Sequence, residues 1–410
     1  MSLTAHRIII TLGTAIILLT VGIIAIFWAR GFKINPQTGI SRTGLIVANS
    51  VPDGAKVFLD DKLVSATNAT ISFLEPKNYS VKITKDGFTT WEKNIEVKAD
   101  LISEIDALLF PLAPELKPLT LSGASKPQLS PDGQKIAYTS SGIEKGGIWI
   151  NTMTDSPLSF NKGPKNVIRN SANVDFDLSN ITWSPSSDEI LVQTTKETPK
   201  YFLFDINHSN NTLTPISESQ ASETLADWQD TIRLLQTNLV SSLPESVQAI
   251  ANQVVDEIPA NTSPTPIPSK AKNITNKTES TQSSKLSLNY SPFNLKFSPD
   301  EEKVLYKLKE GADYSYRVYD NKLKKELVVG TFSKEILVNW YPNSTHLILT
   351  ANNGISIIET DGSNKQLVFS GNFADQKTAF PWPDGSKIVI EANFNTGGTN
   401  QSNLYTLILR

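Results

Sequence analysis

The ten residues Leu129–Tyr138, LSPDGQKIAY, carry the pattern that decides the fold of most of this chain. The proline ends one strand, Asp and Gly form a tight turn, and a run of β-formers begins five positions after the proline. The stretch Pro381–Ile390, PWPDGSKIVI, keeps the same spacing. Each copy of the pattern therefore predicts a β-hairpin.

The same spacing recurs in copies that are centred on Pro131, Pro185, Pro299, Pro342 and Pro383. The turns of the first and last copies are completed by Asp132-Gly133 and Asp384-Gly385. A third short strand follows every hairpin, and a fourth is expected in the first four copies, at residues 158–160, 213–216, 327–329 and 367–369. Four-stranded units that repeat roughly every 40 to 55 residues predict a β-propeller over residues 115–410.

Blade number and ring closure follow from the same copies. Five blades can be counted, whereas a degenerate copy hidden between Pro185 and Pro299 would make six. The fifth copy ends at Arg410 without a fourth strand, and Leu119–Leu121, before the first copy, has the character of one. We expect this segment to pair with the last blade, because an open ring would leave unpaired backbone groups at its seam. The turns and the β-runs after them resemble the WD40-like (PD40) repeats of TolB-type propellers.

A long insertion separates the second and third copies. Its apolar residues follow helical spacing on both sides of Pro244, which predicts a helical hairpin over residues 217–258. Packing against the propeller is the simpler use of the apolar face, and capture of a partner by Leu225, Trp228, Ile232 and Leu235 is the alternative. Residues 259–285 are rich in Pro, Ser, Thr, Asn and Lys, a composition that predicts a flexible tether.

Residues 43–112 show six short alternating strands separated by Asp-Gly and Asp-Asp turns, which predicts a small β-sandwich. Its segment Val51–Asp60, VPDGAKVFLD, with Pro52, Gly54 and Ala55, resembles the opening of the PEGA domain, a bacterial surface module. The segment from Tyr79 to Phe88, followed by Trp91, resembles the closing hairpin of that family. In physical terms, Pro52 presets φ, Gly54 permits the turn and Ala55 allows tight entry of the next strand, so these residues are architectural.

The N-terminal stretch Ile8–Ala29 contains no charged residue and is long enough to span a bilayer as a helix. A cleaved signal peptide is the rival interpretation, but the apolar run is longer than usual and no A-x-A-like site follows it. We therefore expect a cytoplasmic tail at residues 1–7, a transmembrane helix at 8–29, and extracellular or periplasmic domains after it. Flanking charge alone does not settle that orientation.

Composition excludes several function classes. The chain has 410 residues, no cysteine and three histidines, which leaves no thiolate metal site, no Cys nucleophile and little material for a His-based relay. A net charge of −3, from 38 basic and 41 acidic residues, offers no broad attraction to nucleic acid. We find no phosphate-cradling loop and no metal-ligand spacing, so we expect no cofactor.

The sequence thus predicts a single-pass membrane protein that presents a PEGA-like sandwich and a TolB-like propeller at the cell surface. Its expected function is non-catalytic binding of a protein or a cell-envelope polymer such as a polysaccharide. A propeller-based hydrolase or lyase is one alternative, because propellers host such sites. A structural spacer without a dedicated ligand is the other.

Overall fold

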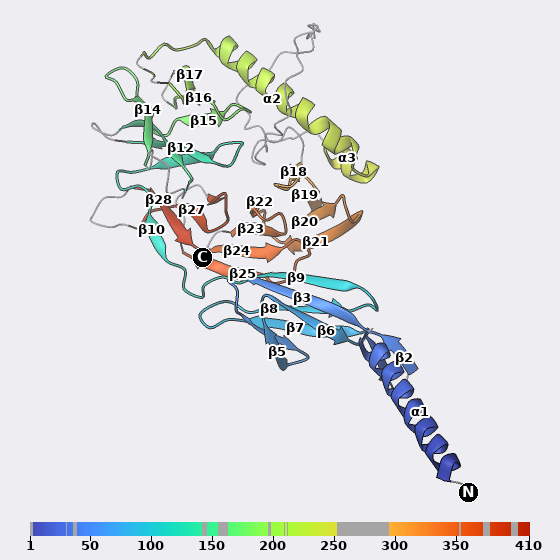
Figure 1. Cartoon of the computed structure of the whole chain (residues 1–410). Coiled ribbons are helices and arrows are strands. Elements are labelled where there is room, and N and C mark those ends of the chain that lie inside the picture. Colours follow the sequence, from blue (N-terminus) through green and yellow to red (C-terminus); the bar gives the residue numbers. More distant parts are fainter. Residues whose placement is uncertain are drawn as a thin grey trace. The chain divides into compact units, whose positions relative to one another are not determined.

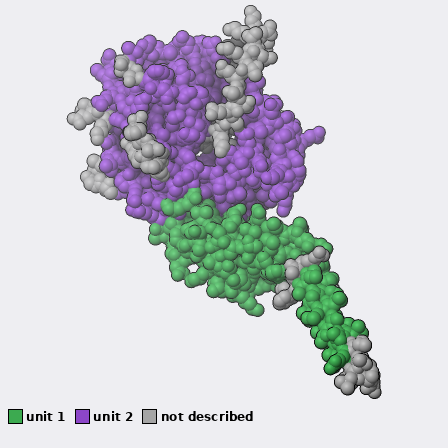
Figure 2. Space-filling view, viewed as in Figure 1, with its two compact units in different colours: residues 1–113, 410 green, residues 114–409 purple. Residues whose placement is uncertain are grey.

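The computed structural model describes residues 3–29, 31–35, 39–141, 146–154, 163–195, 198–208, 210, 212–251, 295–351, 354–371, 378–394 and 401–410. The chain divides into two compact units, residues 1–113 with Arg410 and residues 114–409 (Figure 1, Figure 2). An N-terminal helix and a β-sandwich form the first unit, and a propeller with inserted helices forms the second. The expected order of helix, sandwich and propeller is confirmed.

Helix α1 (Leu3–Ala29) is apolar, and its threonines return their hydroxyl groups to the helix backbone. Thr20, for example, donates to the carbonyl of Ile16, 2.8 Å away. None of the side chains in the window Ile10–Phe27 is buried, and this window is long and apolar enough to cross a membrane. A short hairpin of β1 (Phe32–Asn35) and β2 (Gly39–Arg42) follows the helix.

The sandwich consists of two sheets that bury alternate side chains between them. The first sheet has the order β6-β3-β9, and the second has the order β5-β4-β7-β8. Their strands are β3 (Gly44–Val51), β4 (Lys56–Leu59), β5 (Lys62–Ala66), β6 (Ala69–Leu74), β7 (Asn78–Thr84), β8 (Trp91–Glu96) and β9 (Ile102–Leu108). Ile46, Val57, Val81 and Ile83 are fully buried in the shared core. β3 pairs with β9 in parallel, so both strands begin at the same end of the sandwich.

Five sheets make up the blades of the propeller in the part of the chain that the structure describes. Blade 1 contains β11 (Ser125–Leu129), β12 (Lys135–Ser140), β13 (Gly147–Thr152) and β14 (Lys165–Arg169), and blade 2 contains β15 (Asn180–Trp183), β16 (Glu189–Gln193) and β17 (Tyr201–Asp205). Blade 3 contains β18 (Leu295–Phe297), β19 (Lys303–Glu310), β20 (Asp313–Asp320) and β21 (Lys325–Phe332). Blade 4 contains β22 (Leu337–Trp340), β23 (His346–Ala351), β24 (Gly354–Glu359) and β25 (Gln366–Ser370). Blade 5 contains β26 (Ala379–Pro381), β27 (Lys387–Ala392), β28 (Asn403–Ile408) and β10 (Leu116–Pro118).

The fourth strands agree only in part with the sequence prediction. β21 and β25 contain the segments expected at residues 327–329 and 367–369. In blade 1 the fourth strand is β14, and the segment predicted at 158–160 lies outside the described residues. In blade 2 the stretch 213–216 forms a single bridge, in which the Ile216 amide donates to the Tyr201 carbonyl over 2.8 Å, instead of a strand.

The ring closes between the two ends of the second unit, as predicted, but three residues earlier than expected. β10 pairs antiparallel with β28, so that Leu116, Lys117 and Pro118 lie opposite Leu407, Thr406 and Tyr405. Leu119–Leu121 does not form the strand, although the Leu119 amide donates to the Leu404 carbonyl at 2.8 Å. Leu121 is 84% exposed. The prediction was therefore right about the pairing and wrong about its register.

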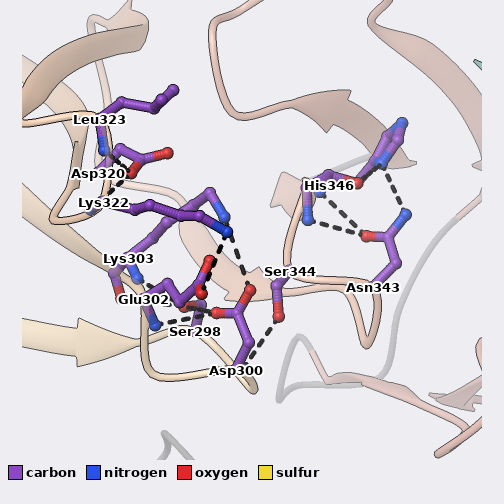
Figure 3. A network of polar contacts seen from close by, with 11 residues as sticks. Ser298, Asp300, Glu302, Lys303, Asp320, Lys322, Leu323, Asn343, Ser344 and His346 are labelled. Carbon is purple, nitrogen blue, oxygen red and sulfur yellow. Dashed lines mark hydrogen bonds and ion pairs between the residues drawn. The ribbon is translucent and has the colours of Figure 1, made fainter. Parts of the chain in front are cut away.

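Neighbouring blades are joined by a contact that recurs with the repeat. In blades 1 and 2 the Asp132 amide donates to Ser187 Oγ over 3.0 Å, and in blades 3 and 4 the Asp300 amide donates to Ser344 Oγ over 3.1 Å (Figure 3). Each aspartate follows its repeat proline by one position, and each serine follows its own by two. The repeat turns therefore connect one blade to the next as well as turning the chain.

Two helices occupy the insertion between blades 2 and 3. α2 (Glu218–Ser241) begins at a capping box formed by Ser217 and Gln220, and α3 (Glu245–Ala251) follows. Ala221 and Trp228 of α2 pack with Leu191 of blade 2. Val240 of α2 and Val247 of α3 pack with blade 3. The two helices thus contact both blade 2 and blade 3. They lie between Pro185 and Pro299, where the sequence left room for a sixth copy of the repeat.

Candidate functional site

An open cleft of about 630 Å³ lies at one end of blade 2. Its lining is formed by seven residues: Asn173, Val174, Asp175, Thr194, Thr195, Thr198 and Lys200. The first three belong to the segment that connects β14 of blade 1 to β15, and the last four belong to the connection between β16 and β17. Both connections emerge at the same end of the blade, because β15 begins where its antiparallel neighbour β16 ends.

The first wall of the cleft is held in shape by its own polar side chains. Asn170 accepts a hydrogen bond from the Phe176 amide at 3.0 Å and donates to Asp175 Oδ1 at 2.8 Å. The Asp177 amide also donates to Asp175 Oδ1, at 3.1 Å. Ser171 and Val174 exchange backbone hydrogen bonds at the tip of the connection. These local bonds fix the connection in a single turn conformation.

The second wall is fixed at its base by a pair of residues. The Thr194 amide donates to the Lys200 carbonyl at 3.0 Å, and the Lys200 amide donates to Thr194 Oγ1 at 2.9 Å. Thr194 is buried, whereas Thr195, Thr198 and Lys200 are exposed. The exposed hydroxyl and ammonium groups are therefore presented on a base that is already ordered.

A cluster of aromatic rings supports the cleft from below. Phe176, which follows the first wall, is fully buried and packs edge-on against Phe202 and Phe204 of β17. Phe202 and Phe204 are themselves stacked, with ring centroids 5.8 Å apart. Val174, the apolar member of the lining, packs against the cluster that contains these rings, so the first wall rests on the core of the blade.

The chemistry of the lining suits a polar ligand. Asp175 supplies a carboxylate, Lys200 an ammonium group, Asn173 an amide and the threonines hydroxyl groups, while Val174 is the single apolar member. Such a surface offers donors and acceptors in alternation but no strong field of either sign. The lining exposes polar and apolar surface in similar amounts, which fits a hydroxyl-rich polymer or an extended peptide better than a polyanion.

Two lysines on the first strands of the blades lie in an unusual environment. Lys296 of β18 donates to the Val338 carbonyl at 2.9 Å and to Asn339 Oδ1 at 3.0 Å, both on β22. Burial, together with the nearby Lys307, lowers the pKa of Lys296 to about 8. Lys126 of β11 donates to Asn180 of β15 over 2.9 Å, and burial lowers its pKa as well. Both lysines join the first strands of adjacent blades, so we assign them to the packing of the ring.

The four residues proposed for partner capture do not form one free surface. Trp228 and Ile232 are buried, with 9% and 0% of their surface exposed, and Leu225 is partly buried against the cluster that includes Leu191. Leu235 is 48% exposed and lies beside the more exposed Leu234. The helical face is thus used largely for packing, and partner capture there stays a prediction that concerns Leu235 alone.

The architectural residues occupy turns in both units. Gly133 and Gly385 have positive φ angles of 69° and 73° in the first and last repeat turns, which favours glycine. In the sandwich, Gly54 has a φ of 67° and Ala55 is fully buried in the core. The Ala55 amide donates to Thr67 Oγ1 at 2.9 Å. None of these residues lines the cleft.

The turn of blade 3 shows how the charged residues of the repeats are used. Burial would raise the pKa of Asp300, but hydrogen bonds from the Ser298 hydroxyl and the Glu302 amide outweigh it and lower that pKa (Figure 3). Lys303 lies 3.6 Å from the same carboxylate. The Asp300 carboxylate and the Glu302 amide thus stabilise the turn.

The two histidines of the propeller lie in different environments. His208 is exposed and lies 2.7 Å from Asp205 Oδ2, whereas His346 is buried and contacts the side chains of Asn343 and Thr345. Among the described residues no group of three or more His, Cys, Asp or Glu side chains is arranged to hold a metal ion.

The cleft carries no motif that the sequence could have revealed. Its two walls lie 19 positions apart at their nearest residues, Asp175 and Thr194, and each wall consists of common loop residues. Only the run of turn-forming residues Asn170–Asp175, NSANVD, indicates an ordered connection, and it does not indicate a ligand.

Comparison with known proteins identifies the first domain. The PEGA domain model matches residues 43–110. No curated protein matches the chain. Similar solved structures include TolB from Acinetobacter baumannii, with 11% identity over 81% of this chain and 62% of that chain and a TM-score of 0.25. The chain therefore spans less than two thirds of the length of that structure.

Two further structures extend this comparison. A putative TolB from Agrobacterium tumefaciens has 9% identity over 90% of this chain and 100% of that chain, with a TM-score of 0.22. An oligogalacturonate lyase in complex with manganese has 11% identity over 82% and 86% of the two chains, with a TM-score of 0.29. Because these scores are low, the propeller assignment rests on the strand pairing of the chain itself. Residues 43–110 are a PEGA domain, and they precede a β-propeller that has five blades among the described residues.

Proposed function

We propose that this chain is a membrane-anchored surface protein whose propeller binds a protein or a cell-envelope polymer without chemical conversion. The observation that carries the proposal is the cleft of blade 2, whose first wall is held by hydrogen bonds of Asn170 and whose second wall is held at its base by the Thr194–Lys200 pair. Ordered walls favour binding because the entropy of their ordering has been lost during folding.

The anchoring half of the proposal rests on helix α1. No side chain of its apolar window Ile10–Phe27 is buried, so the helix would otherwise expose a large apolar surface to water. A bilayer covers such a surface completely. With residues 1–7 in the cytoplasm, both the PEGA domain and the propeller lie outside the membrane, where an envelope polymer or a surface protein is accessible.

The non-catalytic half rests on the composition of the cleft. Asp175 and Lys200 are its charged members, and neither histidine of the propeller lines it. The cleft residues provide a mixed set of hydrogen-bonding groups, which serves recognition.

The binding half is tested by pull-down of envelope extract with the detergent-solubilised full chain. The double variant Asp175→Asn/Lys200→Gln removes both charges from the cleft and keeps a polar side chain at each position. A matched control, Lys56→Gln/Asp86→Asn, makes the same change in an exposed ion pair of the sandwich. We expect the cleft variant to lose the captured polymer or protein and the control to retain it. Equal capture by both variants, or breakdown of the polymer by the wild type, contradicts the proposal.

The anchoring half is tested by protease treatment of intact cells, or of spheroplasts where an outer membrane is present. We expect the propeller to be degraded while the cells remain intact. Protection that lasts until the membrane is lysed would place the propeller in the cytoplasm and contradict the proposed localisation.

A further inference from the structure

The end of helix α1 is tied directly to the first residues of the sandwich. The Gly31 carbonyl accepts hydrogen bonds from the Thr43 amide at 3.0 Å and from Thr43 Oγ1 at 2.8 Å. The β1–β2 hairpin between these two residues therefore leaves the helix end and returns to it. The hydrogen bonds between Thr43 and Gly31 therefore hold the start of the sandwich directly at the end of the helix, with no extended linker between them.

A second set of contacts holds the next turn of the sandwich to the same place. The Asp100 amide donates to the Thr43 carbonyl at 3.1 Å, and Arg42 lies 2.8 Å from the Asp100 carboxylate. Gly44 comes so close to the turn before β9 that an added Cβ would lie 2.3 Å from the Lys98 carbonyl. The turn at residues 98–101 thus packs beside the helix end.

Strand pairing shows which other residues share this end of the sandwich. β9 runs parallel to β3 with Ile102 opposite Leu45, and β6 runs antiparallel to β3 with Leu74 opposite Gly44. The start of β3, the start of β9 and the finish of β6 therefore lie together at the end nearest to α1. We call Phe73, Leu101 and Ile102 the anchor-end residues.

The anchor-end residues are apolar and largely exposed. Phe73, Leu101 and Ile102 have 51%, 55% and 60% of their surface accessible. Single exposed apolar side chains are common on protein surfaces. The anchor-end residues are unusual because they lie on both sides of β3, on or beside β6 and β9, at one end of the domain. Their position next to a helix that is long enough to span a membrane suggests what covers them.

Charge along β9 changes in the direction that a membrane surface would favour. Ile102, Glu104 and Asp106 all point away from the core, because the intervening Ile105 and Ala107 are buried. At about 3.3 Å per residue, Glu104 lies roughly 7 Å and Asp106 roughly 13 Å farther from the anchor end than Ile102. Acidic residues are repelled by anionic lipid headgroups, whereas apolar residues gain from contact with the interface.

We propose that Phe73, Leu101 and Ile102 insert into the interfacial region of the bilayer that holds α1, so that the PEGA domain stands on the membrane surface. This inference rests on the proposed membrane anchoring by α1. The bilayer is the occupant because α1 ends at this face, because Asp100 in the adjacent turn is paired with Arg42, and because the acidic residues of β9 begin beyond it. The sandwich would then be a base of fixed orientation instead of a body on a loose tether.

The absence of cysteine from the sequence permits a direct test in lipid nanodiscs. Single variants Leu101→Cys and Ile102→Cys of the full chain are labelled with a polarity-sensitive fluorophore. Leu112→Cys is the matched control, because Leu112 is 69% exposed and lies at the opposite end, where its amide donates to the Gly87 carbonyl. Ile17→Cys, in the middle of α1, reports on insertion of the helix.

We expect a blue shift of emission, and loss of emission with headgroup spin-labelled lipid, at positions 101 and 102 but not at 112. Quenching at position 17 is read with lipid that carries the spin label in its acyl chain, because the middle of α1 would lie about 15 Å from the headgroups. Lipid quenching at position 17 with equal, weak quenching at 101, 102 and 112 would overturn the inference while leaving the anchor intact. Lack of lipid quenching at position 17 would overturn the anchor itself and, with it, the inference. A blue shift at 101 without lipid quenching would indicate contact with protein, such as a second copy, and would also overturn it.

Discussion

The indole nitrogen of Trp183 donates a hydrogen bond to the carbonyl oxygen of Gln128, 3.1 Å away, and so joins the first strand of blade 2 to that of blade 1. Trp340 makes the equivalent bond from blade 4 to the Lys296 carbonyl of blade 3, at 2.8 Å. Each tryptophan precedes its repeat proline by two positions. The tryptophan two positions before the proline thus belongs to the repeat spacing and also holds adjacent blades together.

We predict that Trp183→Phe destabilises the propeller by about 2 kcal/mol, because the Gln128 carbonyl would lose its partner in a partly buried site. Hydrogen exchange of the amides in β11 and β15 measures the change. Trp91→Phe makes the same substitution in the core of the sandwich, where Trp91 is 4% exposed, and should leave exchange in these propeller strands unchanged. Equal exchange in wild type and Trp183→Phe would show that the indole bond contributes nothing.

Deletion of residues 116–118 should lower the melting temperature of the propeller strongly, because it removes the strand that closes the ring with β28. Deletion of residues 262–264, in the segment whose composition predicts a tether, is the control of equal length. Differential scanning calorimetry compares the two variants. Similar melting temperatures would indicate that the ring does not depend on β10 for its closure.

Gly44→Ala should weaken the sandwich by about 1–3 kcal/mol, since the added methyl group would meet the Lys98 carbonyl at 2.3 Å and the Val97 side chain at 2.6 Å. Gly13→Ala in α1, where an added Cβ meets nothing within 4 Å, is the corresponding control. Urea unfolding followed through the core residue Trp91 measures the loss. An unchanged midpoint in Gly44→Ala would mean that the turn at 98–101 moves aside without cost.

Lys296 should make propeller stability increase with pH between about 8 and 10.5. Its pKa is about 8 in the folded chain and 10.5 when exposed, so the unfolded chain binds more protons throughout this window. Below pH 8 the amine is protonated in both states and contributes no slope. Lys296→Met should remove the increase, as measured by unfolding free energies at several pH values. Parallel curves for wild type and variant would contradict the assignment.

The sequence predicted the hairpins well because their signals are local. A proline that stops a strand and a glycine with positive φ act within a few residues, so all five copies were located at β11–β12, β15–β16, β18–β19, β22–β23 and β26–β27. The same local criterion misplaced the closing strand. Leu119–Leu121 has stronger β-formers than Leu116–Pro118, but the register is set by the distant residues Tyr405–Leu407. Pro118 is tolerated because β10 is an edge strand.

The cleft of blade 2 could not be predicted from the sequence, and the role of the α2 face could be predicted only in part. Helical spacing identified an apolar face on α2, but spacing alone does not show that Trp228 and Ile232 are covered. The cleft depends on the meeting of two connections whose residues are individually unremarkable, as with Asn173 and Lys200. When two loops that are distant in sequence meet only in the folded chain, no periodic pattern in a single sequence reveals it.

The position of β10 has a mechanical consequence. Pro114 is the first residue of the second unit, and β10 begins at Leu116, so a force that stretches the chain between the two units enters the propeller beside its closing strand. A ligand held on blade 2 and pulled away from the membrane would load the β10–β28 pair before any other strand pair of the ring. The bonds that close the circle would then also set the tension at which the propeller opens.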